Sequence, residues 1–183
     1  MTSPGKYLVE LAQYLEEGLS ECGRPVDCVD LTFGNVIDPP QLKGNCNLLV
    51  DVGFDQQPNR MVSSSTKQPL NQRYKDCDWL NRWAGMVRVT RPYEFQPSDC
   101  CHEHTAFVYE YANDVWVVGN LIQRWLKEET EWGESTKTQY VEAYNGGSVT
   151  TRITFSMLLC APNCEELIAE EKQMKGILDA LKK

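Results

Sequence analysis

Residues 98–129, SDCCHEHTAFVYEYANDVWVVGNLIQRWLKEE, decide the fold class, because the spacing of apolar residues changes within them. In residues 83–95, just before this stretch, the apolar residues alternate with polar ones, which is typical of β-strands. Within it they recur every three or four positions from Phe107 to Leu126. That period predicts one long helix, which begins near residue 103 and ends near residue 128. A long helix among strands excludes an all-β fold.

Five stretches around this helix have the pattern of strands. Val87 and Val89 alternate with Arg88 and Thr90, so the two pairs should lie on opposite faces of one strand. The stretch 145–147, Asn-Gly-Gly, supplies the turn residues that a tight hairpin needs. The sequence therefore predicts a final hairpin. The predicted strands are VDCVDLTFG (26–34), CNLLVDVGF (46–54), WAGMVRVTRPYEF (83–95), TQYVEAY (138–144) and SVTTRITFSMLL (148–159).

Two further helices are predicted near the two ends of the sequence. Ser3 and Pro4 form a start signal for the first helix, and Gly23 is a stop signal after its apolar residues. Asn163 and Glu166 resemble a capping box at the start of an amphipathic C-terminal helix.

The element order is therefore α-β-β-(long loop)-β-α-β-β-α. Successive strands should connect directly or through hairpins, so we expect a mainly antiparallel sheet flanked by helices, which is an α+β fold. A length of 183 residues suits a single domain. We expect that domain to span residues 1–183, with a long exposed loop at about 56–78 and a C-terminal helix at about 163–182.

The composition narrows the class of function. The net charge of −8 disfavours tight binding to nucleic acid or to an anionic membrane, because those partners attract basic surfaces. No apolar run approaches the ~18 residues of a membrane span, and the first residues lack the apolar segment of a signal peptide. Nucleotide-binding glycine loops and the common hydrolase motifs are absent from the sequence.

Four neighbouring residues could bind a metal or catalyse a reaction: Cys100, Cys101, His102 and His104. Adjacent cysteines rarely both bind one tetrahedral zinc, so a zinc site would need ligands from a second segment. A thiol nucleophile needs a separate base, but both histidines of the chain lie in this one segment. We therefore expect a structural corner before the helix, without a metal or cofactor, and keep metal binding as the alternative.

The eight cysteines allow several arrangements. Without a signal peptide we expect free thiols in a reducing compartment. We expect Cys28, Cys46 and Cys160 to fill core positions on strands as small apolar residues. A disulfide from Cys77 to Cys100 or Cys101 would close a longer loop, and it stays open as an alternative.

The long loop and its end carry the candidate interface residues. Basic side chains there could meet an acidic partner or could simply be solvated. The two tryptophans could anchor an interface or close the core. The candidate interface residues are Arg60, Lys67, Arg73, Lys75, Trp79 and Trp83.

The order and spacing of these elements resemble the tail terminator proteins of long-tailed bacteriophages. The matching segments begin with the helix YLVELAQYLEEGL and the strands CVDLTFG, CNLLVDVGF and GMVRVTRPYE. The helix TAFVYEYANDVWVVGNLIQRWL and the strands QYVEAY and SVTTRITFSML complete the match. The resemblance covers about residues 5–160 and consists of element order and spacing.

This resemblance implies a structural virion protein of the tail or neck, assembled in the host cytoplasm. Such a protein forms a ring, most often a hexamer, that ends polymerisation of the tail tube and joins the tail to the head connector. Its partners would be other copies of itself, the tail tube protein and the head–tail connector proteins. DNA would only pass through the ring, and neither catalysis nor a membrane would be involved. We expect the loops 34–45 and 56–78 to make contacts between subunits or with these partners.

A different class of function stays open. A zinc- or thiol-dependent enzyme would be centred on Cys100, Cys101, His102 and His104. Metal content separates this alternative from the ring.

Overall fold

A computed structural model describes residues 3–32, 47–54, 80–93, 101–128, 133–139, 147–160 and 164–181. These residues form three helices and five strands in the predicted order, so the α+β fold is confirmed. The elements are α1 (Pro4–Glu21), β1 (Cys28–Thr32), β2 (Leu49–Phe54), β3 (Leu80–Pro92), α2 (Cys101–Glu128), β4 (Gly133–Gln139), β5 (Ser148–Cys160) and α3 (Cys164–Leu181).

The strands form one sheet in the order β1-β2-β3-β5-β4. Three of the four strand pairs are antiparallel, as expected for a mainly antiparallel sheet. The pair β1 and β2 is parallel, which departs from the expected direct or hairpin connections. For two neighbouring strands to be parallel, the connection must cross back to the end of the sheet at which the first strand begins. The alternation of apolar residues does not indicate whether a neighbouring strand runs parallel or antiparallel.

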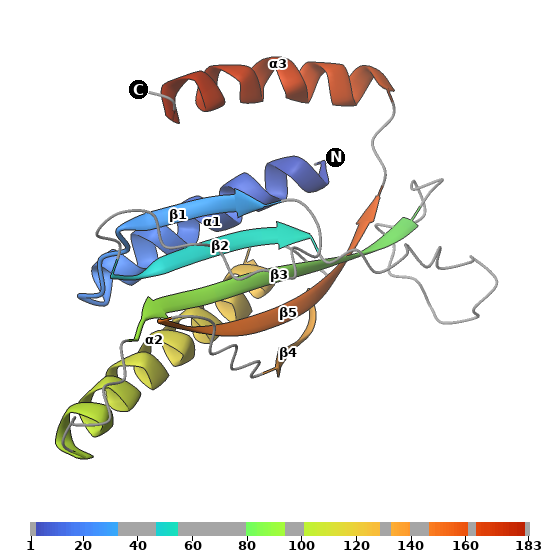
Figure 1. The fold of residues 1–183 in the computed structure, drawn as a ribbon. Helices are drawn as coiled ribbons and strands as arrows, with labels where there is room; N and C mark the ends of the chain where they lie inside the picture. Colours follow the sequence, from blue (N-terminus) through green and yellow to red (C-terminus); the bar gives the residue numbers. More distant parts are fainter. Residues whose placement is uncertain are drawn as a thin grey trace, which may run out of the picture.

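Helices α1 and α2 cover the same face of the sheet (Figure 1). Side chains at alternate positions of the strands point to this face because strands have a period of two. They form the core together with the apolar side of each helix. Strand residues of the core include Val50, Val52, Val87, Val89, Ile153 and Phe155, and helical residues include Leu11, Leu15, Leu19, Val118, Ile122 and Trp125.

Both ends of α1 match their sequence signals. Ser3 is the N-cap, and its Oγ accepts a hydrogen bond from the backbone N–H of Lys6 at 3.2 Å. Gly23 follows the helix with a φ of +69°, a conformation that glycine adopts without strain.

Helix α3 is linked to the start of α1. It lies apart from the sheet, beyond the N-terminal end of α1 (Figure 1). The buried carboxylate of Glu170 accepts the backbone N–H of Ser3 at 3.0 Å and 2.9 Å. In an ordinary capping box the third helical residue supplies this carboxylate, but here that residue is Lys6. Glu170 therefore completes the cap of α1 from a different helix.

Two predicted boundaries differ from the observed ones. Helix α2 begins at Cys101, two residues before the expected start. Strand β4 lies at Gly133–Gln139, earlier than the predicted TQYVEAY strand. Its sequence, GESTKTQ, has no alternating apolar residues, so periodicity could not locate it. Residues 140–146 and Asn163 lie outside the described residues.

Candidate assembly surfaces

Most predicted interface residues lie outside the part of the chain that the structure describes. This holds for Arg60, Lys67, Arg73, Lys75 and Trp79, and for the loops 34–45 and 56–78. Trp83 lies in β3, where its backbone pairs with Met157 of β5. The loop contacts therefore stay predictions.

The cysteine and histidine segment is described in part. Cys100 lies outside the described residues, and Cys101 and His102 begin α2. His104 is exposed, and its Nδ1 lies 2.6 Å from the hydroxyl of Tyr93 at the end of β3. Among the described residues, no three histidine, cysteine or acidic side chains are placed to hold a metal. The metal alternative for Cys100, Cys101 and His102 stays untested because their side chains are not described.

Aromatic side chains join the start of α2 to the sheet. The ring of Tyr93 lies 4.4 Å from that of Phe107, measured between centroids, and Phe107 stacks on Tyr111 at 5.9 Å. The hydroxyl of Tyr111 donates to the carbonyl of Val89 at 3.1 Å and lies 2.7 Å from Oγ1 of Thr151. His104 extends these contacts, because its ring lies beside Tyr93, the residue that follows β3.

The cysteines differ in part from the prediction. Cys22 and Cys164 are free and exposed. Cys28 is only half-buried and forms a disulfide. The prediction that Cys28 is a free thiol filling the core is therefore wrong. The spacing of residues along β1 could not distinguish a buried thiol from a disulfide at a sheet edge.

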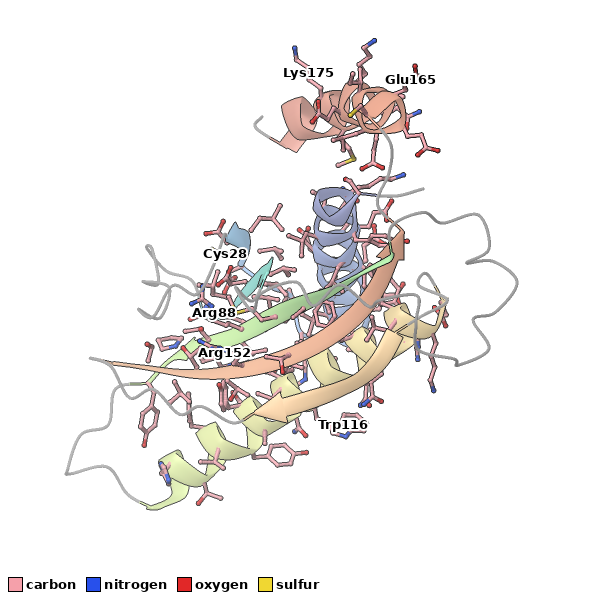
Figure 2. The ribbon with its side chains drawn as sticks, turned by 90° about the vertical axis from the view of Figure 1, so that its right-hand side faces the viewer. Cys28, Arg88, Trp116, Arg152, Glu165 and Lys175 are labelled. Carbon is pink, nitrogen blue, oxygen red and sulfur yellow. The ribbon has the colours of Figure 1, made fainter. Side chains whose placement is uncertain are left out.

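The outer face of α2 carries exposed apolar side chains. We define it by Val108, Tyr109, Ala112 and Trp116, which lie within one side of the helix at 100° per residue. Val108 is 48% exposed, and Tyr109 and Trp116 are each 69% exposed. Trp116 points away from the sheet (Figure 2). A contiguous exposed apolar patch marks an interaction surface, and tryptophan and tyrosine are enriched among the residues that contribute most to binding.

Charged residues are scarce along this face. Between residues 111 and 123 of α2 the only charged residue is Asp114, and its side chain is fully buried. A solvated helix face normally carries charged residues, so their scarcity here sets this face apart. The sequence contained the signal, because Tyr109 and Trp116 fall outside the core-facing stripe that predicted the helix.

Asp114 holds a cluster of ions between the two helices and the sheet. Its carboxylate pairs with Arg24, which follows α1, and with Arg91, at the end of β3. Arg91 Nε lies 2.5 Å from Asp114 Oδ2, without the alignment of a hydrogen bond. Arg91 also reaches the exposed Glu110 at 3.2 Å. Opposite charges balance within this cluster, so it fits a structural role.

A row of charged residues crosses the other face of the sheet. Asp30, Asp51, Arg88 and Arg152 lie directly opposite one another on β1, β2, β3 and β5. Arg88 and Arg152 project from the side away from α2 (Figure 2). Nε and Nη2 of Arg88 both donate to Oδ2 of Asp51, with the Nε bond at 2.6 Å, and both side chains are buried. We call these four residues the charged row.

Comparisons with protein-family models and with curated proteins found no match to this chain. Among the described helices, none combines the length and the apolar character that crossing a membrane requires.

Proposed function

We propose that this chain is a structural virion protein that assembles into a ring and ends the tail tube of a long-tailed bacteriophage. The outer face of α2 is the observation that carries this proposal. Removing exposed tryptophan and tyrosine side chains from water by self-association is favourable, at roughly 25 cal/mol per Å² of apolar area. In a free monomer these apolar side chains would stay exposed to water.

The fold supports the more specific part of the proposal. The observed order of helices and strands is the one on which the resemblance to tail terminator proteins rests. Ring formation requires two different surfaces on each subunit, because a head-to-tail contact joins unlike patches. The outer face of α2 lies on one side of the sheet. Asp30 and Arg152, the two members of the charged row that are not buried, lie on the other side.

Native mass spectrometry of the purified chain, combined with electron microscopy, tests this function. We expect a mass several times 20.9 kDa and ring-shaped particles without bound metal. Replacing Tyr109 and Trp116 together with serine should shift the mass towards the monomer and preserve the circular dichroism spectrum. Asn120→Ser, an exposed change on the same helix, is the matched control and should leave the assembly intact.

Two outcomes would contradict the proposal. A monomer at micromolar concentration would exclude a stable ring. A monomer that holds one zinc, lost on Cys101→Ser, would favour the zinc- or thiol-dependent enzyme. The tail role has its own test: the purified ring should stop elongation of tail tubes from the same phage, and unchanged tube lengths would argue against it.

A further inference from the structure

Of the two arginines in the charged row, Arg152 is the one without a counterion among the described residues. Its side chain is half-buried on β5, and within the described chain it makes no ion pair or hydrogen bond. Arg88 lies directly opposite on β3 and forms an ion pair with Asp51. Like charges placed directly opposite on neighbouring strands repel each other. A half-buried guanidinium beside a second guanidinium is therefore a site that favours an anion, and a planar carboxylate suits its geometry.

A complementary excess of negative charge lies at the end of α1. Glu16, Glu17 and Glu21 are exposed and have no ion-pair partner within the described residues. The last turn of α1 contains no basic residue. Carboxylates at a helix C-terminus oppose the helix dipole, and Glu17 and Glu21 repel each other at a spacing of four. Both effects destabilise the isolated subunit.

The two features cannot meet within one chain. Glu17 and Glu21 lie on the side of α1 that faces away from the core residues Leu11, Leu15 and Leu19. Helix α1 itself covers one face of the sheet, and Arg152 projects from the opposite face (Figure 2). Only a second molecule can bring the carboxylates to the guanidinium.

We propose that Arg152 of one copy binds the carboxylates of Glu17 and Glu21 of the next copy. This inference rests on the proposed function, and it names one contact by which the subunits associate. The contact joins two unlike surfaces, so it repeats from subunit to subunit and closes into a ring if the rotation between neighbours permits. The acidic end of α1 belongs to the same helical layer as the outer face of α2, so one neighbour could cover both.

A charge-swap experiment tests this contact by native mass spectrometry over a range of protein concentrations. Arg152→Glu should raise the concentration needed for assembly at least tenfold. Glu17→Lys with Glu21→Lys should have the same effect, and combining all three changes should restore assembly. Arg152→Lys keeps the charge and should stay close to the wild type. Lys175→Glu, on the exposed side of α3, is the matched control and should change nothing.

The outcomes separate this inference from the proposed function. If the wild type assembles and Arg152→Glu assembles equally well, the contact is wrong while the ring stands. If each single-side change blocks assembly but the combination does not restore it, Arg152 and the acidic end of α1 are not partners. Phosphate that binds the wild type but not Arg152→Glu, with unchanged assembly, would assign Arg152 to a small anion instead. A monomeric wild type removes the basis for both proposals.

Discussion

The ring of Phe155 lies against Gly85, its direct partner on the neighbouring strand, and occupies the space that a side chain at position 85 would need. A Cβ atom built on Gly85 would lie 2.6 Å from Cε2 and 2.8 Å from Cε1 of that ring. Both positions belong to the buried face between sheet and helices. The glycine is thus required by packing, and its backbone φ is not positive.

Gly85→Ala should destabilise the protein. The added methyl group must displace a buried aromatic ring, and overpacking of this kind costs about 1–3 kcal/mol. Urea unfolding followed by circular dichroism measures the loss. Adding Phe155→Leu to Gly85→Ala should recover part of the lost unfolding free energy. If the double variant loses as much unfolding free energy as the two single variants together, the steric explanation is wrong.

Gly119→Ala is the matched control for this substitution. A Cβ at Gly119 in α2 would meet Ile153 Cδ1 at 4.0 Å, which is an ordinary contact. Alanine in a helix interior is favoured over glycine by about 1 kcal/mol, so the variant should be more stable than the wild type. The same chemical change therefore has opposite expected signs at the two positions.

Asp51→Asn should cost about 3–5 kcal/mol of unfolding free energy, because it leaves the buried guanidinium of Arg88 without its carboxylate. Asp30→Asn is the comparison within the charged row. Asp30 is exposed, and its Oδ1 accepts a hydrogen bond from the N–H of Leu31 that asparagine can preserve. Its cost should stay within about 0.5 kcal/mol. If Asp51→Asn and Asp30→Asn lower the free energy of unfolding equally, burial of the Asp51–Arg88 pair does not matter for stability.

Asp114→Asn should also destabilise strongly, by about 3 kcal/mol, because one fully buried carboxylate serves Arg24 and Arg91 together. Glu110→Gln removes a carboxylate from the same cluster, but that side chain is 59% exposed. Exposed ion pairs contribute less than about 1 kcal/mol, so this variant should unfold close to the wild type. Thermal or urea unfolding of the two variants side by side checks the difference.

Tyr14 should make the stability depend on alkaline pH. Burial raises the pKa of its hydroxyl above the ordinary value, and the nearby carboxylate of Glu128 raises it further. Above pH ~10 the unfolded chain loses this proton while the folded chain still binds it, so stability falls as pH rises. Tyr14→Phe should flatten the decline between about pH 10 and the higher pKa of the folded state. Urea midpoints across that range test this, and an unchanged slope would argue against it.

Periodicity predicted those elements whose apolar residues face the core. Helix α2 was located to within two residues because Val118, Ile122 and Trp125 must all reach one sheet. Strand β4 was misplaced because it lacks alternating apolar residues. The parallel direction of β1 was missed because a strand pattern records which face is buried and not which way the neighbour runs.

The candidate surfaces were harder to predict, because charge alone does not determine burial. Arg88 and Asp51 occupy the polar positions of their strands, where solvent is the ordinary expectation, yet both are buried as a pair. Pairing across the sheet depends on register, which a single strand does not encode.

The outer face of α2 was visible in the sequence, because the two aromatic residues Tyr109 and Trp116 fall outside the core-facing stripe. The loops with Arg60, Lys67, Arg73 and Lys75 lie outside the described residues.

The bond from Ser3 to Glu170 has a consequence for synthesis on the ribosome. The two residues are separated by 167 positions, so the first turn of α1 is made long before the carboxylate that completes its cap. During most of translation that backbone N–H has only water as a partner, and the turn should fray in nascent chains. The first helix of the chain would then reach its final stability only when the last helix has emerged.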